Sequence, residues 1–97
     1  MSYRWQCMRP VLGADQAVAY TTSTQSSALG GTNQSFIVRL IATTDCHILI
    51  GKNPTATTTN TFLASKQYEY FAVTPGEKIA VVQDSSGGTL YISEMTN

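Results

Sequence analysis

The chain has 97 residues, 42% of them hydrophobic, and this length allows one buried core but excludes two separate ones. Charged residues make up only 12% of the chain, about half of the usual ~25%, and the formal net charge is zero. The basic residues stand singly along the sequence, which argues against nucleic acid as a partner because phosphate binding depends on clustered positive charge. They are Arg4, Arg9, Arg39, Lys52, Lys66 and Lys78.

The low charge has two interpretations. Either neighbouring molecules cover much of the surface, or Ser, Thr, Asn and Gln keep it soluble without charge. A domain of this size typically keeps only about 5–15 kcal/mol of net stability, which is consistent with an oligomeric or docked state.

Cysteine content and hydropathy bear on where the chain is made. Cys7 and Cys46 are its only cysteines, and one pair indicates neither a disulfide-rich secreted domain nor a metal site. We expect two buried thiols; the alternative is a disulfide between adjacent strands. Residues 1–9 lack the apolar stretch of a signal peptide, and no segment approaches the ~20 apolar residues of a membrane span. We expect synthesis in the cytoplasm and no membrane partner.

The N-terminal third contains one predicted strand. Tyr3–Met8 forms either a strand or an arm that docks on another molecule, and Pro10 ends it. After a turn at Gly13–Asp15, Gln16–Thr22 alternates weakly and predicts a strand. Ser23–Gln34 is rich in Ser, Thr and Gly, which predicts an exposed loop.

The middle of the chain is more strongly apolar. Ser35–Ala42 is apolar on both faces, which predicts a strand that is central in its sheet or covered by a partner. After Thr43–Asp45, the alternating segment Cys46–Ile50 predicts a second strand, and the two strands are expected to form an antiparallel hairpin. Asn53–Thr61 is expected to be a loop rich in threonine. Phe62–Leu63 is expected to return to the core.

The C-terminal third predicts three strands joined by turns. The first, Tyr68–Val73, places Tyr68, Tyr70 and Ala72 on one face. Thr74–Glu77 has the proline and glycine of a type II turn. The apolar strand Ile79–Gln83 follows, and the turn Asp84–Gly88 leads back into Thr89–Met95.

These elements predict an all-β fold, because strands recur about every 8–12 residues with turn signals between them and no segment has a helical period. We expect residues 1–97 to form a single small antiparallel β-sandwich of seven or eight strands, jelly-roll or Ig-like. Residues 35–97 supply the core strands, and residues 1–10 are a possible docking arm.

The ionisable residues do not predict an active site. His47 is the only histidine, and its neighbour Cys46 must point to the opposite face of a strand, so a structural role is expected for it. Glu69 and Glu94 lie within predicted strands, where glutamates usually face solvent, and nothing brings them together as a glycosidase pair. No metal-ligand spacing occurs. We expect no enzyme activity and no cofactor.

The aromatic residues have two interpretations. Trp5 and the tyrosines could stack on sugar rings, as in a carbohydrate-binding module, but aromatics in a small sandwich are more often core or interface residues. The tyrosines concerned are Tyr3, Tyr68, Tyr70 and Tyr91.

Most of the chain resembles a family of small structural proteins encoded among the virion genes of tailed bacteriophages and prophages. The resemblance is carried by Val18–Thr21, Phe36–Ile41, ATTDCHILIGKNPTAT (Ala42–Thr57), Phe62–Leu63, Tyr70–Phe71, TPGEKIAVVQD (Thr74–Asp84) and GGTLYISEMT (Gly87–Thr96). It implies a compact β-sandwich that serves as a capsid decoration or cement protein, or as a small head or tail accessory protein. It supplies no catalytic position, and the N-terminal MSYRWQCMRP lies outside it.

The resulting hypothesis is a non-enzymatic virion protein on the capsid exterior, where it would hold subunits of the major capsid protein together. We expect it to associate with itself as well, a trimer being the favoured state. The expected contacts are the N-terminal residues Tyr3, Arg4, Trp5 and Arg9, and a second group around the threonine-rich loop, Asn53, Pro54, Thr55, Thr57, Thr58 and Phe62. The alternatives are a head–tail connector or tail accessory protein, a carbohydrate-binding module, and a small hydrolase built on His47 or a glutamate pair.

Overall fold

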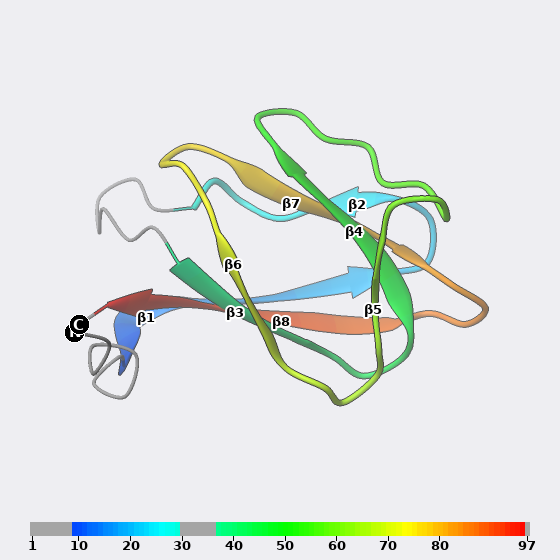
Figure 1. Ribbon diagram of the computed structural model, residues 1–97, viewed down its shortest axis with the longest axis horizontal. Coiled ribbons are helices and arrows are strands. Elements are labelled where there is room, and N and C mark those ends of the chain that lie inside the picture. The colour runs from blue at the N-terminus through cyan, green and yellow to red at the C-terminus, as the bar shows by residue number, and fades with distance from the viewer. Residues whose placement is uncertain (1–8, 30–36, 97) are drawn as a thin grey trace.

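The computed structural model describes residues 9–29 and 37–96, and within these ranges it contains eight strands and no helix (Figure 1). The strands are β1 (Arg9–Tyr20), β2 (Thr24–Gln25), β3 (Ile37–Ala42), β4 (Cys46–Gly51), β5 (Thr61–Leu63), β6 (Glu69–Ala72), β7 (Lys78–Gln83) and β8 (Gly88–Thr96). The predicted strand or arm at Tyr3–Met8 lies outside the described residues.

The strands form two four-stranded antiparallel sheets, with the order β1-β8-β3-β6 in the first and β2-β7-β4-β5 in the second. The arrangement is that of a jelly roll, in which one long hairpin is folded over itself. Its paired strands are β1–β8, β2–β7, β3–β6 and β4–β5. Strands of the second sheet cross obliquely over those of the first (Figure 1). The predicted all-β sandwich is therefore confirmed, with jelly-roll rather than Ig-like strand order.

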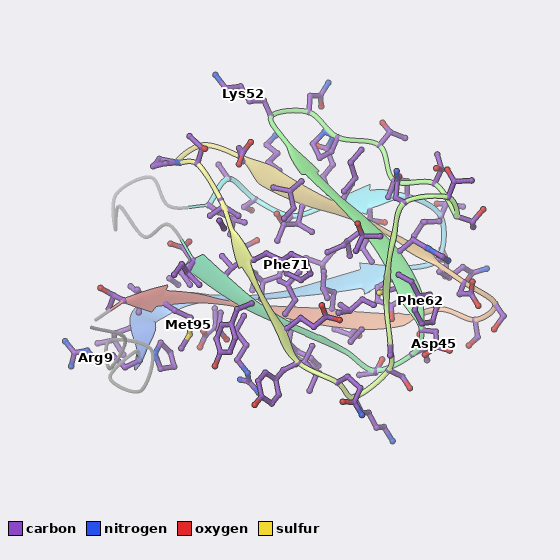
Figure 2. The ribbon with its side chains drawn as sticks, in the orientation of Figure 1. Arg9, Asp45, Lys52, Phe62, Phe71 and Met95 are labelled. Atoms are coloured by element: carbon purple, nitrogen blue, oxygen red, sulfur yellow. The ribbon has the colours of Figure 1, made fainter. Side chains whose placement is uncertain are left out.

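The core lies between the sheets because alternate residues of each central strand point inward. In β3, Val38 and Leu40 are fully buried, and they meet equally buried aliphatic residues from the other sheet. Phe71 packs against this cluster and lies between the two layers in Figure 2. Each fully buried Leu, Ile or Val contributes about 1.5–3 kcal/mol. The aliphatic residues of this cluster in the other central strands are Ile48, Ile79, Val81, Leu90 and Ile92.

β3 is central in its sheet, as its apolar residues on both faces predict, because it pairs with β6 on one side and β8 on the other. The expected hairpin between β3 and β4 is wrong, since these strands belong to different sheets. The connection Thr43–Asp45 passes from one layer to the other. Strand alternation does not distinguish this crossing from a tight turn, because both leave the periodicity of the flanking strands unchanged.

β1 also differs from the prediction. Pro10 does not end a strand and Gly13–Asp15 does not form a turn; both lie within β1, whose register with β8 shifts between Pro10 and Asp15. This irregularity has the character of a β-bulge, and it leaves the side chain of Leu12 98% exposed. Pro10 is tolerated because β1 is an edge strand and needs hydrogen bonds on one side only.

The segment after β1 is not wholly an exposed loop. Thr24–Gln25 forms β2 and pairs with β7, while Ser26 and Leu29 are buried. The Ser26 N–H donates to the carbonyl of Ile79 at 2.8 Å, and the Ile79 N–H donates to Ser26 Oγ at 2.9 Å. The short polar segment is thus fastened to the second sheet by backbone bonds that its composition does not reveal.

The predicted type II turn at Thr74–Glu77 is confirmed. The Glu77 N–H donates to the Thr74 carbonyl at 3.0 Å, and Gly76 has a φ of 94°.

A hydrogen-bonded cluster around Tyr20 closes one end of the sandwich. The Tyr20 hydroxyl donates to the Thr44 carbonyl at 2.8 Å and lies 2.8 Å from Thr44 Oγ1. Thr44 Oγ1 in turn donates to the Ser86 carbonyl at 3.1 Å, and the Thr89 N–H donates to Thr43 Oγ1 at 2.9 Å. These bonds join the end of β1 to both connections that change sheets at this point.

Gly88 is required inside this cluster. A Cβ at Gly88 would lie 2.5 Å from Thr44 Oγ1 and 2.6 Å from Thr43 Oγ1. We expect Gly88→Ala to lower the free energy of unfolding by about 1–3 kcal/mol, because the threonines must move and lose their bonds. Urea unfolding followed by circular dichroism measures this.

Gly51→Ala is the matched control, because a Cβ there meets only Pro54 Cβ at an ordinary 3.9 Å. It should change the free energy of unfolding by about 0.5 kcal/mol or less. Equal effects of the two substitutions would contradict the role assigned to the cluster.

Candidate functional site

The outer face of the first sheet carries a group of half-exposed aromatic residues. The register places Arg39 of β3 opposite Tyr70 of β6, and Ile41 of β3 opposite Tyr91 of β8. Residues that lie opposite each other share a face of the sheet, so these side chains form one surface. We call this surface the tyrosine face; it consists of Ile37, Arg39, Ile41, Tyr68, Tyr70 and Tyr91.

Two of the three rings of the tyrosine face contact each other. Tyr68 and Tyr70 pack edge to face with centroids 5.7 Å apart, and the guanidinium carbon of Arg39 lies 5.4 Å from the Tyr68 centroid. Tyr68, Tyr70 and Tyr91 nevertheless remain 59%, 44% and 48% exposed. Apolar ring surface is therefore exposed on this side of the sheet.

Charge on this face is limited to a few groups. Among residues 9–29 and 37–96, Arg39 forms no ion pair, and its guanidinium lies against the ring of Tyr68. In the same row across the sheet, Ser93 separates it from Asp15 of β1. The guanidinium can thus donate to an acidic group of a partner.

The threonine-rich loop forms a second surface on the second sheet, where it joins β4 to β5 and also contacts Gln25 of β2. Gln25 Nε2 donates to Asn53 Oδ1 at 2.9 Å and to the Pro54 carbonyl at 2.7 Å, and the Ala56 N–H donates to Ser23 Oγ at 2.9 Å. Pro54 and Ala56 are buried, so the loop is fixed to the body of the protein. We call residues 52–60 the threonine loop; its exposed residues are Lys52, Asn53, Thr55, Thr57, Thr58 and Thr59.

Phe62 adjoins this loop and corrects one expectation. Leu63 returns to the core as predicted, but Phe62 is 48% exposed and packs edge to face on His47 at 5.4 Å. The two residues are neighbours in β5, so only one of them can point inward.

The predicted contact residues do not all come together. Tyr3, Arg4 and Trp5 lie outside the described residues, and Arg9 is exposed at the start of β1, opposite Thr96. In Figure 2, Arg9 and Phe62 lie at opposite ends of the molecule. The threonine loop and Arg9 therefore belong to separate surfaces, and the tyrosine face, which the contact prediction did not include, lies on the outside of one sheet.

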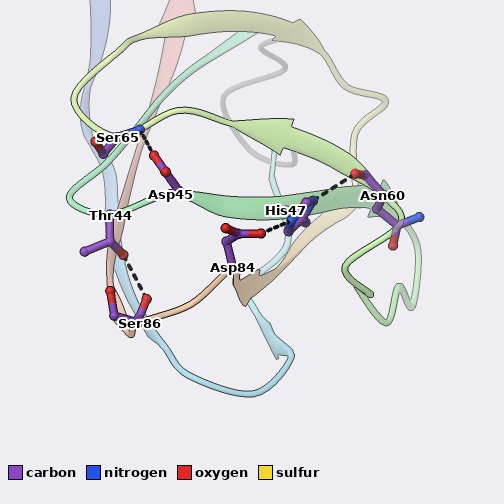
Figure 3. A network of polar contacts seen from close by, with 7 residues as sticks. All are labelled: Thr44, Asp45, His47, Asn60, Ser65, Asp84 and Ser86. Atoms are coloured by element: carbon purple, nitrogen blue, oxygen red, sulfur yellow. Dashed lines mark hydrogen bonds and ion pairs between the residues drawn. The ribbon is translucent and has the colours of Figure 1, made fainter.

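His47 lies in a polar network on the outer side of β4 (Figure 3). Its Nε2 is 2.9 Å from Asp84 Oδ1 and its Nδ1 is 3.0 Å from the Asn60 carbonyl oxygen. The hydrogen bond to Asp84, and next the Asn60 carbonyl, raise the pKa of His47 against the opposing effect of burial. Cys46 points into the core instead, so the two side chains do not converge.

The glutamates occupy different environments. Glu69 is exposed, but Glu94 is only 5% exposed, which contradicts the expectation that it faces solvent. The parity of β8 places Glu94 on the same face as buried Leu90 and Ile92. The described ranges contain no group of three or more His, Cys, Asp and Glu residues placed to hold a metal ion.

Comparisons with known proteins and the search for membrane spans give no further assignment. No protein family, curated protein sequence or solved structure matches this chain. Within residues 9–29 and 37–96, no helix is long and apolar enough to cross a membrane.

Cys46 is a buried free thiol, as predicted for this residue, whereas Cys7 lies outside the described part. Burial raises the pKa of Cys46 to about 11. In a Cys7→Ser chain at pH 8, we expect a thiol reagent to label Cys46 about a hundredfold more slowly than in the unfolded chain, because thiolate is scarce. Similar rates in the folded and unfolded chains, measured by absorbance, would contradict this.

Proposed function

We propose that this chain is a non-enzymatic structural protein of a bacteriophage virion, which decorates the capsid exterior and stabilises contacts between major-capsid subunits. The observation that carries the proposal is the tyrosine face, which presents three half-exposed tyrosines and one arginine on the outside of a rigid sheet. The sequence resemblance to small virion proteins supports it. The jelly-roll fold is also consistent, since capsid and lectin domains both use it, but a fold alone does not select a function.

The composition of this face favours a protein partner. Tyrosine and arginine are enriched among residues that dominate protein–protein binding energy. Ile37 and Ile41 lie in the same surface, and both are partly buried. A sugar would require several converging polar groups, whereas this face is mainly aromatic and aliphatic. The partner surface is therefore a protein patch that is apolar around a carboxylate, which pairs with Arg39.

The threonine loop with Phe62 is proposed as the second contact surface, between copies of the chain in a homo-oligomer such as a trimer. It is fixed, nearly uncharged and flanked by an exposed aromatic ring. Such a surface associates through shape and apolar area rather than through charge.

The location in the virion is tested by counting copies. Particles of the phage that encodes this chain are purified, and the chain and the major capsid protein are quantified by mass spectrometry. A copy number comparable to that of the capsid subunits is expected. A number as small as that of one ring at the tail vertex would support a connector or tail accessory protein, and absence from particles would overturn the proposal.

The docking surface is tested with Arg39→Gln and Tyr91→Ser. Each should weaken binding to particles that lack the chain by about tenfold or more, because the residue lies within the buried contact. Thermal unfolding should be nearly unchanged, since Tyr91 is 48% exposed. Cosedimentation of the purified variants with the particles measures binding.

Phe62→Ser is the matched control for that experiment, because Phe62 has the same 48% exposure on the other sheet. Phe62→Ser should weaken the association of the chain with itself, but a single copy of the variant should bind the capsid with unchanged affinity. Loss of capsid binding in Phe62→Ser but not in Tyr91→Ser would reverse the roles assigned to the two surfaces.

A carbohydrate-binding module is the second candidate function, favoured by the exposed pair Tyr68 and Tyr70. Under this alternative, a glycan array gives specific binding that Tyr68→Ala and Tyr70→Ala abolish, because the exposed faces of the tyrosine rings would stack on sugar rings. We expect no such binding; a reproducible, tyrosine-dependent signal would favour this function over capsid decoration.

A further inference from the structure

Both ring nitrogens of His47 face hydrogen-bond acceptors. Nε2 lies 2.9 Å from the carboxylate oxygen Oδ1 of Asp84, and Nδ1 lies 3.0 Å from the backbone carbonyl oxygen of Asn60. Figure 3 shows the ring between these two groups, which come from the connection after β7 and the loop before β5. The His47 side chain is largely covered, being only 10% exposed, whereas the Asp84 side chain is 43% exposed.

This arrangement distinguishes the two protonation states of the ring. A neutral imidazole carries one N–H, so it can donate to only one of the two oxygens and turns a lone pair toward the other. An imidazolium carries two N–H groups and donates to both. The positions of Asp84 and Asn60 therefore match the charged ring and leave one bond unmade in the neutral ring.

We propose that His47 is a pH-sensitive clamp, which in its charged form ties the threonine loop and the connection after β7 to β4, and which releases one of them on deprotonation. The threonine loop is the segment affected most directly. Asn60 accepts the His47 bond through its carbonyl, while its N–H donates to the Thr57 carbonyl at 3.0 Å and its Oδ1 accepts from the Thr57 N–H at 2.7 Å. A change at His47 is thus passed directly to the end of the loop.

The surroundings of the ring contain one titratable partner. Within the described ranges, Asp84 is the charged group in contact with His47. The neighbouring Asp45 is engaged elsewhere, since its carboxylate accepts from the Ser65 N–H at 2.8 Å. Phe62 from β5 and Val82 from β7, which lie opposite His47 in the sheet, are uncharged.

The direction of the pH effect follows from these contacts. Asp84 first, and then the Asn60 carbonyl, raise the pKa of His47 above its ordinary value of 6.5. The stabilisation is therefore fully present below 6.5 and is lost as the pH rises through the raised value of the folded protein. While the Asp84 carboxylate is ionised, the threonine loop is clamped below pH 6.5 and loosens as the pH rises through the raised pKa of His47 in the folded protein.

The single histidine allows a direct test by nuclear magnetic resonance on untagged, 15N-labelled protein. Long-range proton–nitrogen spectra report the protonation of both ring nitrogens across a pH titration. We expect both to be protonated at pH 6.5 and the titration midpoint to lie above it. The backbone amides of Thr57 and Asn60 should shift with the same midpoint, which a purely structural histidine would not require.

Two variants make the test specific. Asp84→Asn removes the charge that holds the imidazolium and should lower the midpoint. Asp45→Asn removes a carboxylate next to His47 in sequence but not in contact with its ring, and should leave the midpoint unchanged. Should Asp84→Asn fail to fold, the titration of the unmodified protein still decides the protonation state.

Three results would overturn the inference. A His47 titration midpoint at or below 6.5 would contradict the charged clamp. Equal midpoints in Asp84→Asn and the unmodified protein would contradict the role of Asp84. Backbone amides of the threonine loop that do not shift with the titration would contradict the coupling between His47 and the loop. These measurements require only the folded protein, so their outcome does not depend on the proposed virion role.

Discussion

The jelly roll depends on the hydrogen bonds that Tyr20 makes where the chain changes sheets. Its hydroxyl donates to the carbonyl of Thr44 and accepts from the Thr44 N–H at 3.3 Å, so one buried side chain satisfies both backbone groups of a connecting residue. In this connection the Thr43 N–H donates to the Thr89 carbonyl of β8 at 3.0 Å, whereas both backbone groups of the partly buried Thr44 are paired by Tyr20. A buried backbone group left unpaired costs about 1–3 kcal/mol. With Tyr20 in place, this crossing can lie close to the core.

The polar contacts that fix the connections leave the outer face of the first sheet without such contacts. The polar contacts that fix connections and loops gather around Tyr20 and Thr44, around His47, and where Asp45 accepts from Ser65. The outer face of the first sheet takes no part in them and is free to carry aromatic residues. Tyr68, Tyr70 and Tyr91 stay about half exposed on this face, and large exposed apolar patches often mark interaction sites.

Local sequence patterns predicted the features that depend on neighbouring residues, namely which side chains of a strand share a face and where a turn lies. The alternation in Tyr68–Val73 placed Tyr68 and Tyr70 on one face, and Thr74–Glu77 carried the signature of its turn. The sheet to which each strand belongs depends on contacts between distant segments, which is why the β3–β4 hairpin was predicted wrongly. The short strand β2 was missed because its pairing with β7 rests on backbone bonds rather than on apolar side chains.

The candidate site was less predictable for the same reason. The sequence predicted a strand at Glu94 and a return to the core at Phe62, but both residues proved to be on the side opposite to that expected. The contact of His47 with Asp84 joins residues 37 positions apart, and no spacing rule connects them. The burial and the partners of these residues depend on segments that are distant in the sequence, so the neighbouring residues do not predict them.

The scarcity of charge gives the position of each charged side chain more weight. In a chain with 12% charged residues, an arginine at the centre of a mainly apolar face is not one member of a dispersed solvating set. Arg39 is partly buried and its guanidinium lies against the Tyr68 ring, and reduced contact with water would strengthen a pairing with a carboxylate of the proposed partner. The hydroxyl-rich threonine loop keeps its surface polar with a single charged residue, Lys52. The fold thus separates the stabilising contacts at the crossings from the face that we propose for partner binding, so residues of that face can be changed without loss of the core.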